Sequence, residues 1–158
     1  SRGITLIEVT IVSALAMLVV LGMIGFYISS QSSWMAGSSQ AIAQRDATLL
    51  IEAISDSVRA AAHAEVNRAD SLHHTLILRD AAQTEFWRFW WDGNDHRIHQ
   101  GPGVSQDRGP VVNSPVTRFQ LDTLTRLVAI RLVELQADDG QAVRIASAAA
   151  LYNRRATP

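Results

Sequence analysis

The feature that most constrains this chain is an apolar run from Ile4 to Ile28 that carries a single charged side chain, Glu8. As an α-helix with a rise of about 1.5 Å per residue, this run of roughly 25 residues spans roughly 37 Å, whereas the hydrocarbon core of a bilayer is about 30 Å thick. We therefore expect residues 4–28 to cross a membrane. An ionised carboxylate inside such a helix costs about 2.5–3.5 kcal/mol, so Glu8 requires a cationic partner, a path to water or a functional role.

A cleaved secretory signal is the alternative interpretation of the same run. Its apolar region usually covers only about 7–15 residues and avoids carboxylates, so the longer run with Glu8 near its start favours a retained anchor. Arg2 precedes the run. Because basic residues tend to stay on the cytoplasmic side, we expect a cytoplasmic amino terminus and an outward-facing remainder.

Residues 3–12, with the sequence GITLIEVTIV, resemble the cleavage and methylation motif of prepilins, the precursors of type IV pilins and type II secretion pseudopilins. The resemblance implies that a prepilin peptidase cuts after Gly3 and methylates the new terminal residue, Ile4, where the family usually has phenylalanine or methionine. It also implies that Glu8 pairs with the terminal amine of a neighbouring subunit in a fibre, an attraction that a low dielectric strengthens. Residues 1–3 would then end a short leader.

Beyond Ile28 the pattern predicts that the same helix continues as an amphipathic segment over residues 29–64. No proline occurs before Pro102, and apolar residues return at spacings of three or four. The apolar positions are Ala47, Leu50, Ile54, Val58 and Ala61, and the charged positions between them are Arg45, Asp46, Glu52, Asp56 and Arg59.

Gly22 and Gly25 lie within the first half of this predicted helix. Glycine costs about 1 kcal/mol relative to alanine in a helix, so the pair could let this region bend or melt during assembly, as in related pilins. Small residues also permit close helix contact in membranes. Both interpretations stay open.

From Leu72 onward, short runs rich in aliphatic and aromatic residues predict antiparallel strands. Turn sequences at residues 92–95 (DGND) and 138–140 (DDG) predict hairpins, and residues 101–115 predict a long loop. Alternation over residues 128–133 places Val128, Ile130 and Leu132 on one face. We expect strands at Thr75–Arg79, Glu85–Trp91, Arg97–His99, Thr117–Leu121, Leu127–Leu135 and Val143–Leu151.

These elements predict an α+β fold of pilin-like form, with a long N-terminal helix packed against an antiparallel β-sheet head. The expected organisation is a leader end at 1–3, a membrane or fibre-core helix at 4–28, its amphipathic continuation at 29–64 and a head at 65–158. A major pilin usually has a cysteine pair or a calcium-type terminal loop, and this sequence has no cysteine. The closing segments 127–132 and 143–154 also resemble those of minor subunits, so a minor subunit is favoured.

Catalytic and metal chemistry has few candidates in the head. Adjacent strand residues point to opposite faces, so His73 and His74 are not expected to share a site, and the spacing of His96 and His99 leads to the same expectation. The other histidine is His63. We therefore predict no enzyme activity, no cofactor and no metal site. A net charge of −1 likewise gives no indication of nucleic-acid binding.

The densest aromatic segment, residues 86–91, divides into two faces by strand alternation. Trp87, Phe89 and Trp91 share one face, and Phe86 and Trp90 share the other. We expect one set to fill the core, which would leave Trp90 exposed with Arg88 as a contact site for another subunit or a secreted substrate.

Taken together, the sequence predicts a minor structural subunit of a type IV pilus or a type II secretion pseudopilus that acts in fibre initiation and assembly. The resemblance implies as partners other pilin or pseudopilin subunits, a prepilin peptidase and an inner-membrane assembly platform, and a secreted substrate is a further candidate. The expected location is the inner membrane, with a periplasmic head, and then the fibre. The alternative is a single-pass membrane-anchored periplasmic binding or sensor domain that does not polymerise.

Overall fold

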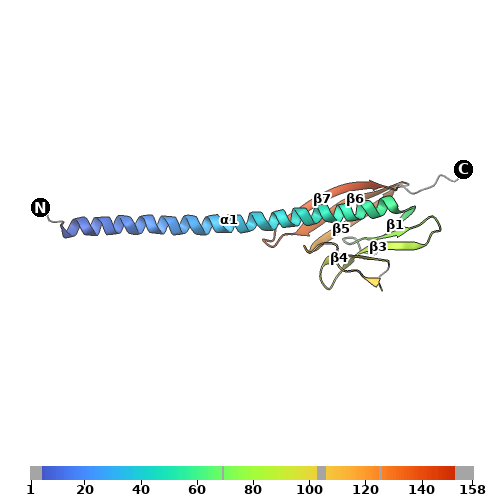
Figure 1. Ribbon diagram of the computed structural model, residues 1–158, viewed down its shortest axis with the longest axis horizontal. Helices are drawn as coiled ribbons and strands as arrows, with labels where there is room; N and C mark the ends of the chain where they lie inside the picture. Colours follow the sequence, from blue (N-terminus) through green and yellow to red (C-terminus); the bar gives the residue numbers. More distant parts are fainter. Residues whose placement is uncertain (1–4, 69, 103–105, 125, 152–158) are drawn as a thin grey trace. The chain divides into compact units, whose positions relative to one another are not determined.

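The computed structural model describes residues 5–68, 70–102, 106–124 and 126–151. These residues form one helix followed by antiparallel strands, which confirms the predicted α+β class. The elements, labelled in Figure 1 where there is room, are α1 (Leu6–Ala60), β1 (His63–Asn67), β2 (Thr75–Arg79), β3 (Glu85–Asp92), β4 (Arg97–Gly101), β5 (Val116–Leu124), β6 (Leu127–Gln136) and β7 (Ala142–Ala150). The chain divides into two compact units, residues 1–38 and residues 39–158.

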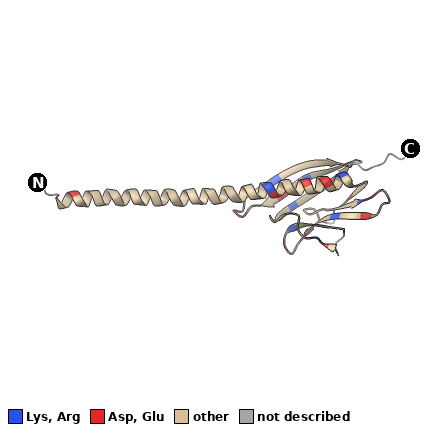
Figure 2. Ribbon diagram, viewed as in Figure 1, with Lys and Arg blue, Asp and Glu red and all other residues tan. Residues whose placement is uncertain are grey.

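The first unit contains the N-terminal part of α1, and its described residues carry one charged side chain, Glu8 (Figure 2). The next charged residue along the helix is Arg45, in the second unit. An 18-residue window of α1 has a mean hydropathy of 2.5, and none of it is buried. The helix is therefore long and apolar enough to cross a membrane, as the apolar run predicts.

The second unit, the head, contains two antiparallel sheets and the C-terminal part of α1. One sheet has the order β1-β2-β3-β4, and the other has the order β5-β6-β7. Neighbouring strands in each sheet are joined in sequence order, so each sheet is a meander. The hairpins predicted at 92–95 and 138–140 are confirmed, since they join β3 to β4 and β6 to β7.

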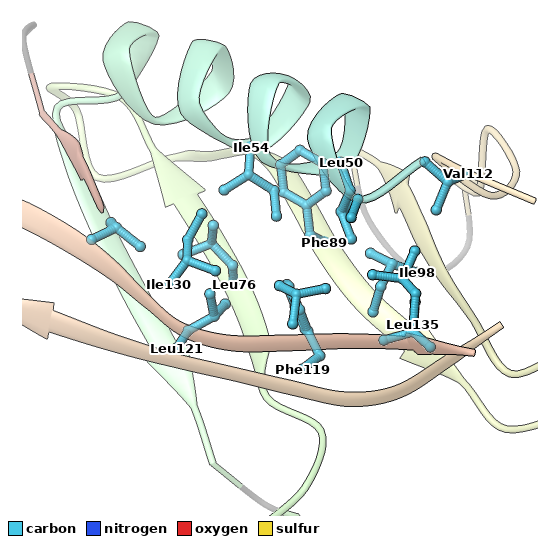
Figure 3. Packing of buried hydrophobic residues seen from close by; sticks show 14 of the residues in the cluster. Leu50, Ile54, Leu76, Phe89, Ile98, Val112, Phe119, Leu121, Ile130 and Leu135 are labelled. Atoms are coloured by element: carbon cyan, nitrogen blue, oxygen red, sulfur yellow. The ribbon is translucent and has the colours of Figure 1, made fainter. Parts of the chain in front are cut away.

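The core of the head lies between α1 and the two sheets (Figure 3). All five apolar helix positions predicted from the 3.6-residue period are fully buried, namely Ala47, Leu50, Ile54, Val58 and Ala61. Figure 3 shows Leu50 and Ile54 extending from the helix toward Phe89 of β3. The fully buried sheet residues around them include Leu76, Phe89, Ile98, Phe119, Leu121, Ile130 and Leu135.

The helix ends at Ala60, before the expected residue 64, and His63–Asn67 form β1, which the sequence analysis missed. The alanine-rich sequence here suits a helix, but the backbone N–H of Ala62 donates to the carbonyl of Arg79 at 3.0 Å. β1 then pairs along β2, with His63 opposite Arg79. This pairing with the next strand along the chain overrides the local helix preference.

Strand β6 departs from simple alternation because its pairing with β7 shifts between Ile130 and Val133. Val128 and Ile130 are buried as predicted, whereas Leu132 is only partly buried and Val133 and Leu135 are fully buried. An irregularity of this kind reverses which residues face the core beyond it. The prediction that Leu132 shares a face with Val128 and Ile130 was therefore wrong.

Candidate assembly segment and head surface

The two residues assigned to processing, Gly3 and Ile4, lie outside the described residues. Glu8 lies in the first turn of α1, where its backbone N–H donates to the carbonyl of Thr5 at 3.1 Å. The residue is exposed. A carboxylate in the first turn of a helix interacts favourably with the positive end of the helix dipole.

The apolar side chains that follow Glu8 are exposed around the whole helix. The exposed fraction of large apolar residues between Leu6 and Ile28 is 51% or more, and they include Val9, Leu15, Leu18, Leu21, Ile24 and Phe26. A surface of this size is stable only when lipid or other apolar surfaces cover it. The first unit therefore has the surface of a segment that could lie in a membrane.

Gly22 and Gly25 lie within the continuous helix, and the structure shows helical backbone at both positions. A Cβ added at either residue would meet no atom within 4 Å. Contacts within the chain therefore do not require glycine at these positions. Both proposed roles, helix flexibility and close contact with another helix, remain predictions.

The expected contact site at Arg88 and Trp90 does not have the predicted exposure. Only 9% of Trp90 is exposed, and its ring centroid lies 5.9 Å from that of His99 on the neighbouring strand. The side chain of Arg88 is also fixed in place. It donates hydrogen bonds to the Glu85 carboxylate from Nε at 2.8 Å and from one terminal nitrogen at 2.9 Å. The prediction that Trp90 is exposed was wrong.

The loop between β4 and β5 contacts His99, the residue whose ring lies next to Trp90. Asp107 in this loop contacts the Nδ1 atom of His99, which pairs with Trp90 across the sheet and so shares its face. The loop also lies along the edge of β4, where the backbone N–H of Val111 donates to the carbonyl of Ile98. Sequence alternation separated Phe89 from Trp90, but it was wrong for Phe86, which packs against the core cluster together with Trp87 because the pairing with β2 shifts between Trp87 and Glu85.

His99 lies between two carboxylates. Its Nδ1 lies 2.5 Å from Asp107, its Nε2 lies 2.9 Å from Asp95, and its side chain is only 10% exposed. Burial by itself would lower the pKa of His99, but the hydrogen bonds to Asp95 and Asp107 outweigh it and raise the pKa above 6.5. Burial would raise the pKa of Asp95, yet its bonds to His99 and to the Arg97 amide lower it below 3.8.

Asp92, Asp95 and His99 are the described residues that come closest to a metal-ligating group, with one ligand atom from each lying within 4.8 Å of the others. The other hydrogen bonds of these residues are those of a hairpin turn that contains an ion pair. Asp92 accepts from the Asn94 amide at 2.8 Å, and Asp95 accepts from the Arg97 amide at 3.0 Å. We therefore assign this cluster a structural role in joining the β3–β4 turn to the β4–β5 loop.

A cavity of about 440 Å³ opens beside Trp91, between residues that are distant in sequence. The ring of His73 stacks on Trp91 at a centroid distance of 3.8 Å, and the indole N–H of Trp91 donates to the Val116 carbonyl at 2.9 Å. Its lining is formed by His73, Trp91, His96, Pro115, Val116, Thr117 and Gln136. The sequence analysis did not identify this cavity, since its walls come from β3, β5 and β6 together.

His73 and His74 contact different partners, in agreement with their predicted separation. His73 lies 2.6 Å from Asp70 and 3.1 Å from the Thr117 carbonyl, whereas the Nδ1 atom of His74 lies 3.0 Å from the Leu121 amide. Both histidines thus fasten the segment before β2 to β5. No acid and nucleophile accompany them in the arrangement of a catalytic triad among the described residues of the cavity.

Comparison with known proteins identifies no relative of this chain: no family model, no curated protein and no solved structure matches it.

Proposed function

We propose that this chain is a minor structural subunit of a type IV pilus or a type II secretion pseudopilus, cut after Gly3 and methylated at Ile4. One observation carries the proposal. Glu8 follows Gly3 by five positions and opens a helix whose apolar surface is exposed from Leu6 to Ile28. A membrane covers such a surface before assembly, and the same surfaces of neighbouring subunits cover it afterwards.

In this proposal, Glu8 determines the axial position of each subunit in the fibre. Moving its carboxylate into an apolar helix bundle is costly unless a cation is within reach. The amine created at Ile4 of a neighbouring subunit supplies that cation, and the low dielectric strengthens the attraction. Subunits shifted from this alignment leave Glu8 unpaired, so a single alignment is strongly preferred.

The head would select the neighbouring subunits in the fibre and so place this subunit among them. Support comes from its compact core, which gives the head a defined surface. The expected partners are other pilin or pseudopilin subunits, a prepilin peptidase and an inner-membrane assembly platform.

Processing provides the direct test. The full-length protein is co-expressed with a prepilin peptidase, and the mature N-terminus is determined by mass spectrometry. We expect a protein that begins with N-methylated Ile4. A Gly3→Val variant should remain uncut because the added side chain obstructs the position before the scissile bond, whereas Gly25→Ala should be cut normally. A mature protein that begins elsewhere would contradict the proposal.

The cavity beside Trp91 favours one alternative, a membrane-anchored binding domain that stays in the bilayer. Cavities of roughly 300–1,000 Å³ with mostly apolar walls commonly hold small ligands, and this one measures about 440 Å³. A binding domain does not require processing at Gly3. An uncut Gly3→Val variant that keeps the full biological activity of the wild-type protein would therefore favour this alternative.

A further inference from the structure

Trp34 is an exposed aromatic residue on α1, six residues beyond the end of the apolar run at Ile28. Its exposed fraction is 78%, and that of the adjacent Met35 is 63%. Tryptophan is enriched at membrane–water interfaces because its ring contacts acyl chains while its N–H bonds to headgroup oxygens or water. An exposed tryptophan just beyond a membrane-length run has the chemistry expected for the headgroup layer.

Two hydroxyls of the serine-rich segment between Ile28 and Trp34 are already bonded to the helix backbone. The hydroxyls of Ser32 and Ser33 both donate to the carbonyl of Ser29 at 2.9 Å. A hydroxyl bonded to its own helix loses less on leaving water than an unpaired one. This segment is therefore suited to the boundary between hydrocarbon and headgroups.

The spacing of Glu8 and Trp34 matches the full thickness of a bilayer. Trp34 follows Glu8 by 26 positions along α1, which corresponds to about 39 Å, and to about 37 Å across the bilayer with a tilt of about 20°. A bilayer measures about 30 Å across its hydrocarbon and about 40–45 Å with headgroups. When Trp34 lies in the outer headgroup layer, Glu8 therefore lies in the inner one.

We propose that Trp34 anchors α1 in the outer lipid headgroup layer and thereby keeps Glu8 in the inner headgroup layer until the subunit leaves the membrane. This inference rests on the membrane-spanning helix of the proposed function. Before assembly, the Glu8 carboxylate is then hydrated. The full cost of moving it into an apolar environment therefore arises in the assembly step.

The apolar run taken alone predicts a different depth. Centred on its own length, the run places Ala16 at the bilayer midplane, whereas equal distances from Glu8 and Trp34 place Leu21 there. The two positions differ by five residues, or about 7.5 Å. With Ala16 at the midplane, Glu8 would lie about 12 Å from it, inside a hydrocarbon half-thickness of about 15 Å; with Leu21 there, it lies about 20 Å away.

Because the chain contains no cysteine, single cysteines allow the depth to be measured directly. Nitroxide labels are placed at Ser13→Cys and Ser30→Cys in the full chain, at high dilution in phosphatidylcholine–phosphatidylglycerol vesicles. Their depths follow from relaxation by oxygen and by a water-soluble nickel complex. We expect Trp34→Ser to shift both labels toward the outer side of the membrane. The shift should be at least about 1.5 Å, the rise of one residue, and no more than about 7.5 Å.

Matched variants distinguish anchoring from damage to the helix or head. Trp34→Tyr should retain the original depth of both labels, and so should Ile42→Ser, which alters an exposed apolar residue farther along α1. Unchanged label depths in Trp34→Ser would overturn the inference, and the proposed function would stand. Reduced fibre incorporation with unchanged depth would instead identify Trp34 as a subunit contact. Labels that lie outside the bilayer in every variant would overturn both proposals.

Discussion

The carboxylate of Asp46 on α1 accepts two hydrogen bonds from Ser114, one from its backbone N–H and one from its hydroxyl, each at 2.9 Å. Ser114 belongs to the loop between β4 and β5 and is 9% exposed. Two residues earlier, Val112 enters the core with 5% exposure. The contact thus holds the loop against the helix and helps to place Val112 in the core.

We expect Asp46→Ala to destabilise the head by about 1–3 kcal/mol, since the substitution leaves two donors of the buried Ser114 without their acceptor. Urea unfolding of the full chain in detergent micelles, followed by tryptophan fluorescence, measures the change. Asp56→Ala is the matched control. Its ion pair with Arg59 is exposed, so its loss should cost less than about 1 kcal/mol. Equal effects of the two substitutions would contradict the assigned role of Asp46.

The stability of the head should fall as the pH rises through the raised pKa of His99. The protonated ring donates to both Asp95 and Asp107, so its stabilisation is complete below the unfolded-state value of 6.5 and is lost above the folded-state value. The lowered pKa of Asp95 acts on the acidic side of the profile. Its contribution to stability is present above pH 3.8 and is lost as the pH falls below that value. Unfolding free energies measured from about pH 2 to about pH 9 test both directions.

His99→Gln should flatten the alkaline side of this profile, because the glutamine amide does not titrate. The exposed His96 provides the control, and His96→Gln should preserve the decline. A decline that persists in His99→Gln would assign it to another group.

Neighbouring leucines on α1 should differ sharply in their contribution to stability. Leu50 is fully buried in the head core, whereas Leu49 is 43% exposed. Leu50→Ala removes buried methyl groups and leaves a cavity, so we expect a loss of about 2–5 kcal/mol. Leu49→Ala has the same helix propensity change and should cost less than about 1 kcal/mol. Chemical denaturation of both variants measures the difference, and similar losses would mean that the helix face is assigned incorrectly.

Gly101 should not tolerate a side chain. A Cβ at this position would lie 2.4 Å from the carbonyl oxygen of Gln106, a backbone atom that cannot rotate away. We expect Gly101→Ala to cost about 1–3 kcal/mol through the displacement of this loop. Gly37→Ala is the control, because a Cβ there meets no atom within 4 Å and favours the helix by about 1 kcal/mol. Thermal unfolding of the two variants should move in opposite directions.

Glu8→Gln should leave membrane insertion unchanged but reduce incorporation into fibres, since a neutral amide cannot neutralise the terminal amine of a neighbouring subunit. Quantitative immunoblotting of membrane and sheared fibre fractions separates the two effects. Glu52→Gln removes an exposed carboxylate from the same helix and should have no effect on either fraction. Incorporation of Glu8→Gln at the wild-type level would exclude the proposed pairing.

Periodicity predicted the head most accurately where one helix or strand face meets one core. Ala47, Leu50, Ile54, Val58 and Ala61 were identified from spacing alone, and all five are fully buried. The strand Thr75–Arg79 was predicted with its observed bounds. Failures occurred where pairing with a second strand intervened. β1 requires β2 as its partner, and the altered face of β6 depends on its register with β7.

The candidate sites divide in the same way. Glu8, Gly22 and Gly25 are apparent in the sequence because they are exceptions within a simple apolar helix. Trp90 was misassigned, since strand alternation separates two faces without revealing what covers each one. The short spacing of Asp95 and His99 across a turn is compatible with their ion pair. Asp107 contacts His99 only because the loop between β4 and β5 brings it there.

By itself, the sequence determined the long apolar helix with its single acid, the buried stripe of its second half and the order of helix and strands. These properties follow from hydrophobicity and from periods of 3.6 and 2 residues, which act over short distances along the chain. Only the tertiary structure decided where the helix ends, which face of β3 is covered and how His99 acquires two carboxylates. Those outcomes depend on contacts between different elements, which the periodicity within a single element does not encode.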